Sequence, residues 1–369
     1  MSSQKPPFDP HALADWLTQG LKETVSYRIA QTFDRDKWLQ KVRDKIPTRS
    51  GALHFALKRL FEKFDFKFEE FKQGDAKFYV VRKKFRDLKP GQEVRRLVMV
   101  PGFGDSPASW LTVFASSFLE LEKRFDEIVV LDFPGYMGFL SGHAMVPSME
   151  ILISVAKTVC EAYRPTVLIG HSLGGWLAAK VAQATPHLMD QLILIAPAGL
   201  IPSHEERERF GKFILSNQDI EPAEMLGRII HKPKRYHSIL NHDLKQFFSG
   251  DGLKQFVESV TEAHFVDQTK PFSARKLTVI WGEKDLFVPS QGIRDWVEAY
   301  GLYLDAFILK DTGHLPQLER PLATSDLIFQ SIAGTASKST SDWLKIQSRR
   351  MEWANARLDQ PANTKLLSG

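Results

Sequence analysis

The apolar residues of this chain change their spacing along its length. Between residues 11 and 30 they recur every four positions, which predicts an amphipathic helix, and a second helix is expected at 52–61. Within residues 64–68 phenylalanine alternates with charged residues, which is typical of a half-buried strand. A Gly-Asp turn at 74–75 then leads to the next expected strand at 78–81.

From residue 97 onwards, short continuous apolar runs alternate with longer helical patterns. The expected strands are 97–100, 128–131, 166–169, 192–196, 277–281 and 306–309, and the expected helices are 109–121, 149–163 and 173–184. Continuous apolar strands separated by helices are typical of a mostly parallel sheet that is covered on both faces. The pattern therefore predicts an α/β fold.

This alternation stops between residues 200 and 272, where a charged stretch carries many aromatic residues. An insertion of this length is more than a loop, and we expect it to fold as helices over one end of the sheet. Near the carboxyl end, Trp343, Ile346 and Trp353 indicate a last helix. The predicted organisation is an N-terminal helical extension (1–62), a core (63–199 and 273–334), a helical lid (200–272), and a C-terminal linker and helix (335–369).

The segment at 166–180, TVLIGHSLGGWLAAK, carries the clearest chemical signal. A short apolar strand runs into GHSLG at 170–174, and a helical pattern follows at once. G-x-S-x-G between a strand and a helix is typical of a sharp turn that exposes a nucleophilic serine. The glycines leave room where Cβ atoms would crowd the turn, and the helix start favours developing negative charge. Ser172 is the predicted nucleophile.

A serine nucleophile needs a base and an acid that orients the base, and both are expected downstream in the order Ser, Asp, His. Asp285 and His314 each follow an expected strand, at the end where α/β sheets place their chemistry. We therefore predict His314 as the base and Asp285 as the orienting acid. Glu283 and Asp311 are nearby carboxylates that geometry could promote instead.

Acyl transfer also needs hydrogen-bond donors for the oxyanion of the tetrahedral intermediate. One expected donor is the backbone N–H of Leu173, the residue after the nucleophile. The other is the N–H of Phe103, in the glycine-containing loop PGFGDS at 101–106. His171 is not expected to be the base, because neighbouring side chains on a tight turn point apart.

From residue 97 to 332 the chain resembles the α/β-hydrolase superfamily. The matching pieces are PGFGDS at 101–106, LDFPG at 131–135, GHSLGG at 170–175, WGEKDLFVP at 281–289 and TGHLPQLERP at 312–321. The resemblance implies an α/β-hydrolase fold in which Ser172, Asp285 and His314 form the triad and Phe103 and Leu173 form the oxyanion hole.

Within that superfamily, LIAPAGL at 194–200 is most similar to the branch of monoacylglycerol lipases, carboxylesterases and carbon–carbon bond hydrolases. The chain departs from the family at 101–102, where Pro-Gly replaces a frequent His-Gly.

These features together predict a serine hydrolase that cleaves a carboxylic ester through an acyl-enzyme and needs no cofactor and no metal. The phenylalanine-rich insertion favours a lipid or other small-molecule ester with an apolar acyl chain. A carbon–carbon bond hydrolase, a thioesterase or an acyltransferase could use the same three residues. A catalytically silent binding protein is the alternative from a different class.

The bulk composition indicates the cellular compartment of the protein. The 369 residues are 43% hydrophobic and 25% charged, as in an ordinary globular protein. The single cysteine, Cys160, excludes an intrachain disulfide and favours a reducing compartment. Residues 1–10 contain no secretory signal, and no apolar run is long enough to span a membrane. We therefore expect a soluble, cytoplasmic protein of unknown oligomeric state.

The net charge of +5 is unevenly distributed. Residues 1–90 hold 20 Lys and Arg against 12 Asp and Glu, a local net charge of +8, so the remainder is near −3. Either these charges are solvated while the apolar stripe of 11–30 packs on the domain, or the segment makes a peripheral contact with an anionic membrane. No recognised nucleic-acid-binding module is present, so no nucleic-acid partner is expected.

Overall fold

The computed structural model of the chain describes residues 58–346 apart from positions 60, 90, 135–146, 186, 202, 217–219, 234–243, 245–247, 249–250, 302 and 337. The helix expected at 11–30 and the residue Trp353 lie outside the described residues. So does most of the helix expected at 52–61, whose described residues 58, 59 and 61 are helical.

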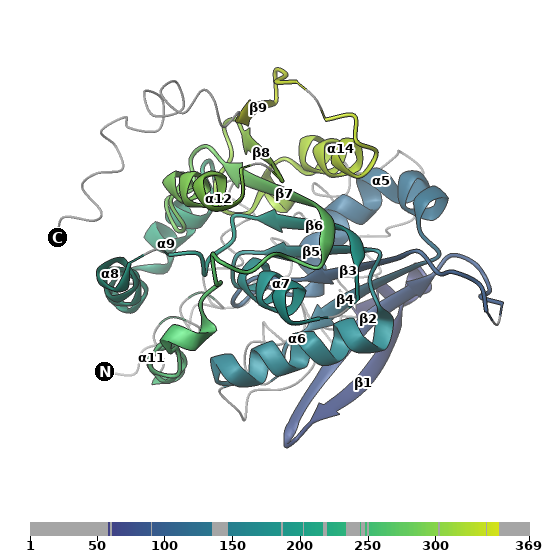
Figure 1. Cartoon of the computed structure of the whole chain (residues 1–369), viewed down its shortest axis with the longest axis horizontal. Helices are drawn as coiled ribbons and strands as arrows, with labels where there is room; N and C mark the ends of the chain where they lie inside the picture. Colours follow the sequence, from purple (N-terminus) through teal and green to yellow (C-terminus); the bar gives the residue numbers. More distant parts are fainter. Residues whose placement is uncertain are drawn as a thin grey trace, which may run out of the picture.

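The described residues form a nine-stranded sheet with the strand order β1-β2-β4-β3-β5-β6-β7-β8-β9 (Figure 1). Its strands are β1 (Lys67–Gln73), β2 (Ala76–Lys84), β3 (Arg96–Val100), β4 (Glu127–Asp132), β5 (Val167–His171), β6 (Met189–Ile195), β7 (Ala274–Gly282), β8 (Leu304–Leu309) and β9 (Trp343–Ile346). Strands β3 to β8 pair in parallel, whereas β1, β2 and β9 pair antiparallel at the two edges. The predicted mostly parallel α/β sheet is confirmed.

Helices cover both faces of the sheet, as the continuously apolar strands require (Figure 1). Along β3, Val98 and Val100 pack in one core, while Leu97 and Met99 pack in the other. The first core includes residues of α6 (Met149–Tyr163), α7 (Leu173–Ala184) and α12 (Ile293–Tyr300), and the second includes α5 (Leu111–Arg124) and α14 (Pro321–Ile332).

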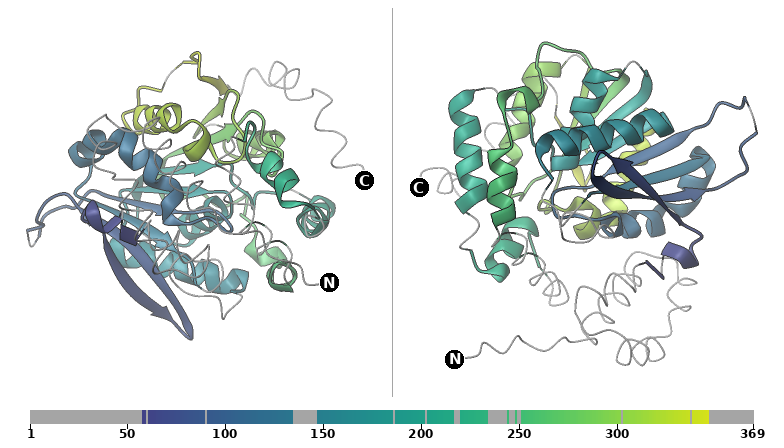
Figure 2. Two further views of the ribbon diagram at one scale, coloured as in Figure 1. Left: turned by 180° about the vertical axis from the view of Figure 1, so that it is seen from behind. Right: turned by 90° about the horizontal axis from the view of Figure 1, so that it is seen from below.

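The insertion is helical, as expected, in its described parts. It contains α8 (His204–Ser216), α9 (Pro222–Ile229), α11 (Asp251–Glu258) and the short 3-10 helix η5 (Glu262–His264). In the right-hand view of Figure 2, α8 and α11 run side by side at one end of the molecule. Short helical turns elsewhere are η1 (Pro107–Trp110), η6 (Ser290–Gly292) and α13 (Pro316–Glu319). None of the described helices is long and apolar enough to cross a membrane.

Two predicted elements differ from the structure at the edges of the sheet. The strand expected at 64–68 begins only at Lys67, because Asp65 occupies a left-handed turn conformation with a φ of 59°. The helix expected from Trp343 is instead the strand β9 over residues 343–346. Pairing with β8 decides this short segment, since it lets Trp343 become buried beside Leu309.

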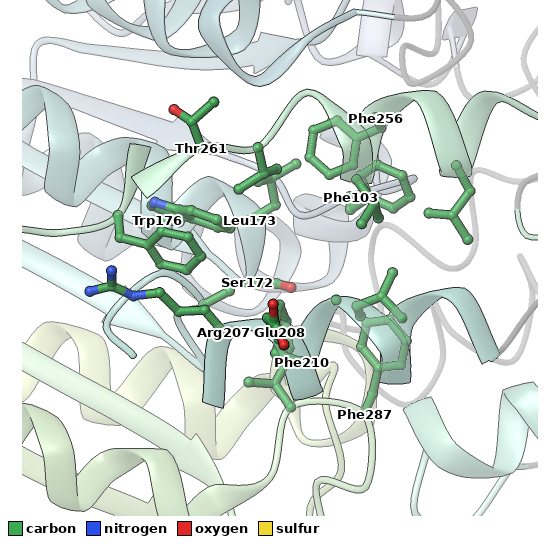
Figure 3. A pocket seen from close by; sticks show the side chains of 18 of the residues that line it. Phe103, Ser172, Leu173, Trp176, Arg207, Glu208, Phe210, Phe256, Thr261 and Phe287 are labelled. Atoms are coloured by element: carbon green, nitrogen blue, oxygen red, sulfur yellow. The ribbon is translucent and has the colours of Figure 1, made fainter. Parts of the chain in front are cut away.

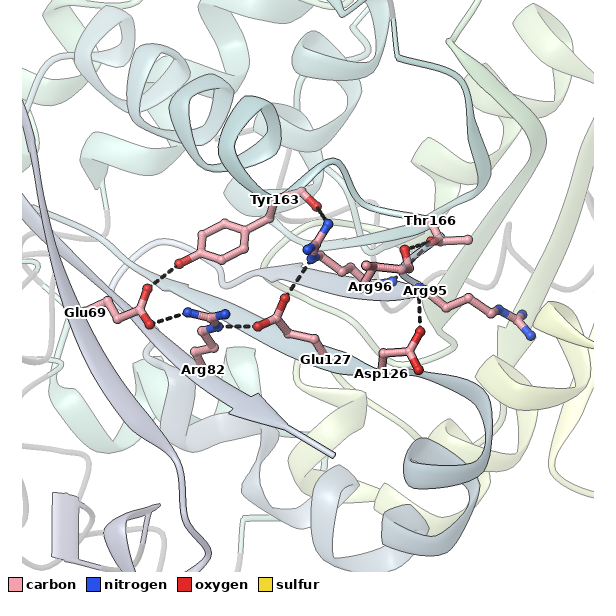
Figure 4. Close-up of polar contacts among 9 residues, drawn as sticks. Glu69, Arg82, Arg95, Arg96, Asp126, Glu127, Tyr163 and Thr166 are labelled. Carbon is pink, nitrogen blue, oxygen red and sulfur yellow. Dashed lines mark hydrogen bonds and ion pairs between the residues drawn. The ribbon is translucent and has the colours of Figure 1, made fainter. Parts of the chain in front are cut away.

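A buried ionic network fastens the amino-terminal ends of β3 and β4 (Figure 4). The carboxylate of Glu127 is fully buried and contacts the guanidinium groups of both Arg82 and Arg96. Arg82 also bonds Glu69, whose other oxygen accepts a 2.7 Å hydrogen bond from the Tyr163 hydroxyl. Removing one member of such a buried set leaves an uncompensated charge, typically at a cost of about 3–5 kcal/mol. Loss of one member should therefore destabilise the amino-terminal ends of β3 and β4.

Candidate active site

Ser172 lies at the turn between β5 and α7, with a φ of 54° and a ψ of −119°. Residues other than glycine rarely adopt this conformation, which costs of order 1–3 kcal/mol and persists only where surrounding bonds hold it. Here the Ser172 amide donates to the carbonyl of Ile195 at 2.8 Å, and the Ser172 carbonyl accepts from the amides of Trp176 and Ala198. The turn is therefore rigid, and the serine side chain lines a pocket.

The glycines on either side of Ser172 permit close backbone approach. A Cβ atom on Gly170 would overlap the carbonyl oxygen of Gly174. A Cβ atom on Gly174 would overlap the carbonyl oxygens of Val100 and Pro101. The steric reason expected for the G-x-S-x-G spacing is thus present in the fold.

The loop after β3 packs against this turn, since a Cβ atom on Gly102 would lie only 3.2 Å from the Cβ atom of Ser172. Phe103 and Leu173 line the same pocket as Ser172. Leu173 is the first residue of α7, so its N–H has no acceptor within the helix. The structure brings both predicted oxyanion residues to the candidate nucleophile.

Asp285 and His314 form a buried pair after β7 and β8. Oδ2 of Asp285 lies 2.7 Å from Nδ1 of His314, and the two residues are 0% and 4% exposed. Oδ1 of Asp285 accepts from the backbone amides of Phe287 and Val288 at 2.9 and 2.8 Å. Because an ionised carboxylate only accepts hydrogen bonds, Nδ1 of neutral His314 carries the hydrogen and Nε2 keeps its lone pair.

The two alternative carboxylates have other partners. Glu283 accepts from the backbone amide of Asp311 at 3.2 Å. The Asp311 carboxylate lies 3.7 Å from the Lys232 ammonium group. Within the described part of the chain neither carboxylate contacts His314, whereas Asp285 does.

The main chain of His314 is held from two sides. Its amide donates to the carbonyl of Ile229, at the end of α9, at 2.7 Å. Its carbonyl lies 2.8 Å from Nε2 of His171, which must donate because a carbonyl only accepts. Nδ1 of His171 lies 3.6 Å from Asp105 and 3.4 Å from Gln317. His171, the residue beside the candidate nucleophile, thus contacts the candidate base, and the sequence did not indicate this contact.

Glu319 is a second residue whose contribution the sequence did not reveal, although it lies in the motif TGHLPQLERP. Its carboxylate accepts hydrogen bonds from the backbone amides of Gly313, Leu315 and His231. Burial raises the pKa of Glu319 to about 7, against the opposing effect of these hydrogen bonds. Because His231 follows α9, Glu319 ties the insertion to the loop that carries His314.

A cavity of about 280 Å³ lies over Ser172, between the sheet end and the insertion. In Figure 3, Ser172 lies between Trp176 and Arg207 on one side and Phe103, Phe256 and Phe287 on the other. Four phenylalanines of the insertion line this cavity: Phe210, Phe248, Phe256 and Phe265. Charged groups gather at one part of the wall: His204, Arg207, Glu208 and Glu262.

The described residues contain no group of three or more His, Cys, Asp or Glu side chains arranged to hold a metal ion. Cys160 is buried, and burial raises the pKa of its thiol to about 12, so it is not a reactive thiolate at neutral pH.

The fold and these residues define the class of protein. The sequence profile of the alpha/beta hydrolase family matches residues 97–327, which is more than half of the chain. The chain therefore belongs to the alpha/beta hydrolase family of enzymes.

Several known proteins are similar to it. A dihydrolipoyllysine-residue acetyltransferase component of an acetoin cleaving system from Pseudomonas putida is 25% identical over 60% of this chain and 59% of its own length. The monoacylglycerol lipase ABHD6 of Bos taurus is 22% identical over 66% of this chain and 77% of its own.

Among solved structures, a putative lipase (lip1) from Acinetobacter baumannii AYE superposes with a TM-score of 0.58 at 17% identity, covering 79% of this chain and 96% of that one. This likeness shows the shared fold.

Proposed function

We propose that this protein is a serine hydrolase that cleaves carboxylic esters of apolar acyl chains, with Ser172, His314 and Asp285 as its triad. The observation that carries the proposal is the buried 2.7 Å contact of Asp285 with His314, at the sheet end where strained Ser172 opens into an apolar pocket. The lipases among its relatives and structural neighbours support the ester as the substrate class.

In the proposed first step, Nε2 of His314 removes the proton of the Ser172 hydroxyl as its oxygen attacks the acyl carbonyl. The backbone amides of Phe103 and Leu173 donate to the oxyanion that forms. The tetrahedral intermediate collapses, the ester C–O bond breaks, and His314 protonates the departing alcohol. Asp285 keeps the hydrogen of the imidazole on Nδ1 and stabilises the imidazolium without taking the proton.

In the second step a water molecule attacks the acyl-enzyme. His314 accepts a proton from this water, and a second tetrahedral intermediate uses the same two amides. Its collapse returns the proton to Ser172 and releases the carboxylic acid. The protein thus supplies the base, the donors and the position of the substrate, and the two steps together return Ser172 and His314 to their starting protonation.

The acyl group would occupy the aromatic part of the cavity. The rings of Phe103 and Phe256 lie 4.8 Å apart, and those of Phe248 and Phe287 lie 5.9 Å apart. Each methylene buried there contributes about 0.8 kcal/mol to binding. The charged residues of the opposite wall, including Arg207 and Glu208, suit a polar alcohol portion better than a second acyl chain.

Fluorophosphonate labelling tests the proposal directly, since only an activated serine reacts. We expect the wild-type chain to be labelled and to hydrolyse p-nitrophenyl esters, with turnover rising from acetate to medium-chain acyl groups. Ser172→Ala should abolish labelling and lower kcat by on the order of 10⁶ while the fold is retained.

Labelling that survives in folded Ser172→Ala would overturn the assignment of the nucleophile. Absence of both labelling and ester turnover in the wild type would favour the catalytically silent binding protein.

A further inference from the structure

A second cavity, of about 230 Å³, lies beside the first at the carboxyl ends of β6 and β7. Its wall is built by the chain after β6, by α8, and by the segment from Asp285 to α12. Apolar side chains make up much of that wall: Leu200, Ile201, Phe213, Trp281, Leu286 and Pro289. Arg209, whose side chain is 52% exposed, also borders this cavity, so part of its rim faces solvent.

The two cavities share three lining residues, Ala198, Phe210 and Val288. Shared residues mean that a partition about one side chain thick separates the two spaces. Ala198 and Val288 are small and belong to segments fixed by β6 and by the Asp285 loop. Phe210, on α8, is the largest side chain of the partition.

Phe210 is also held differently from the other aromatic residues of the site. Phe248 and Phe213 both contact the ring of Phe287, and Trp176 contacts Phe265 at 4.8 Å. Phe210 makes no ring contact with any residue that the structure describes, and its side chain is half-buried. A helical phenylalanine has two common χ1 rotamers, so a ring without aromatic partners can exchange between them at little cost.

We infer that Phe210 is the specificity-determining partition of the acyl pocket, and that the second cavity receives the distal end of acyl chains too long for the first. The inference rests on the proposed ester hydrolysis and adds the chain length to it. With Phe210 in place, chains that end within the first cavity fit directly, and longer chains require the ring to move. Each methylene that crosses into the second cavity would raise binding by about fourfold.

The test compares kcat/KM for p-nitrophenyl esters from C2 to C16 in the wild type and in Phe210→Ala. For acyl chains longer than the wild-type optimum, we expect kcat/KM of the variant to rise at least about tenfold relative to its kcat/KM for acetate. Two methylenes bound in the second cavity, at about fourfold each, are enough for a gain of this size. The matched control is Phe272→Ala, which removes an aromatic ring of the same insertion that lines neither cavity. It should leave the position of the optimum unchanged.

A second variant keeps the inference falsifiable if the loss of the ring has broader effects. Adding Ile201→Trp to Phe210→Ala refills the second cavity alone and should return the optimum to the wild-type chain length. An unchanged optimum in folded Phe210→Ala, or a uniform loss on all chain lengths, would overturn the partition. A wild type that cleaves no ester and takes no fluorophosphonate would instead defeat the proposed function, so the two failures are distinguishable.

Discussion

The two oxygens of the Asp285 carboxylate have different partners. One accepts from two backbone amides, and the other faces the imidazole of His314. The backbone bonds fix the plane of the carboxylate, because both come from the short loop that follows it. The imidazole therefore meets an acceptor whose position does not depend on solvent, which favours one tautomer and one ring orientation.

Exchanging this carboxylate for an amide should reveal its importance. Asp285→Asn keeps the shape but can present an N–H to Nδ1, so the imidazole would turn to the unproductive tautomer. We expect kcat to fall roughly 10⁴-fold. Asp311→Asn and Glu283→Gln should change kcat by less than about fivefold, because contacts of this kind contribute under about 1 kcal/mol. A collapse in Asp311→Asn with little change in Asp285→Asn would reverse the assignment.

Glu319 should make the stability of the protein depend on pH. Its pKa is about 7 in the folded protein and near 4.5 in an unfolded chain. Between these values the folded state holds a proton that the unfolded state has lost, so stability falls as pH rises from about 4.5 to about 7. The loss attributable to this group is at most about 3 kcal/mol. Near neutral pH the fold thus tolerates a partly charged carboxylate because three backbone amides surround it.

Glu319→Gln removes that titration while keeping an oxygen that accepts hydrogen bonds. In denaturant unfolding between pH 5 and pH 8, the wild type should lose stability relative to this variant as pH rises. Asp326→Asn, on the exposed side of α14, is a suitable control and should run parallel to the wild type. Parallel curves for Glu319→Gln and the wild type would show that Glu319 has no raised pKa.

The residues of the site differ in how far the sequence could reveal them. Ser172, Asp285 and His314 each follow a strand, and the carboxyl ends of parallel strands lie at the same end of the sheet. Local sequence patterns were therefore enough to predict them as site residues. Glu319 and His171 act through backbone groups of distant segments. The Glu319 contact with His231 joins residues 88 positions apart, and no spacing rule encodes such a contact.

At the scale of elements, burial decides which predictions hold. The expected bounds 149–163 and 173–184 coincide with α6 and α7, whose apolar faces and end signals are strong. The chain leaves α6 at Arg164, in a left-handed conformation with a φ of 44°. Trp343 and Ile346 are three residues apart, which matches a helical spacing, whereas in β9 they pack in the two different cores. Pairing with the neighbouring strand β8 decides between helix and strand for this segment, and a sequence of four residues does not indicate which strand it will pair with.

Arg207 connects α8 to the rest of the insertion. Its guanidinium donates to the carbonyl of Ile201, pairs with Glu262, and stacks over the ring of Phe265 at 4.6 Å. The side chain is 21% exposed, so these contacts are partly shielded from solvent. They hold α8 against η5 along one wall of the cavity over Ser172. This helix carries Phe210 as well, so its position sets the shape of both cavities.

Arg207→Met should loosen this wall while keeping much of the apolar stem. We expect KM for a long-chain ester to rise about fivefold, equivalent to about 1 kcal/mol, with a smaller change for acetate. Lys212→Met on the same helix, whose side chain is 79% exposed, should leave both KM values unchanged. An equal effect of Arg207→Met on acetate and long-chain esters would mean that Arg207 contributes to folding rather than to the position of Phe210 on α8.

At the scale of the whole molecule, the sheet separates chemistry from stabilisation. The candidate triad and both cavities lie at the carboxyl ends of the parallel strands. The Glu127 network lies at their amino ends (Figure 4). Parallel strands force this arrangement, since every loop that follows a strand opens at the same edge. Substitutions in the network should therefore lower stability without altering the chain-length profile.

The amino-terminal part of the chain is basic. Around the described strands β1 and β2, ion pairs with carboxylates already neutralise part of this positive charge. Lys77 pairs with Glu70 at 2.6 Å, Lys67 pairs with Asp65 at 3.0 Å, and Arg82 lies between two carboxylates. Residues 1–57 lie outside the described residues, and their sequence adds only +3, from nine basic and six acidic side chains.

These pairs favour a solvated charged surface over a membrane contact. A membrane-bound lysine contributes about 1 kcal/mol only when its charge is available to anionic lipid, and a carboxylate close by cancels most of that attraction. We therefore expect the full chain to stay in the supernatant when sedimented with phosphatidylserine vesicles or neutral vesicles at 0.15 M salt, where screening already acts beyond about 8 Å.

The exposed residues Lys72 and Lys84 provide the sharper comparison. Lys72→Glu with Lys84→Glu should behave like Lys123→Glu with Lys338→Glu, which changes the net charge equally elsewhere. Two results together would assign this surface to the membrane instead. The protein would sediment with anionic vesicles at low salt but not at high salt, and only the first pair of substitutions would weaken this binding, by at least about tenfold.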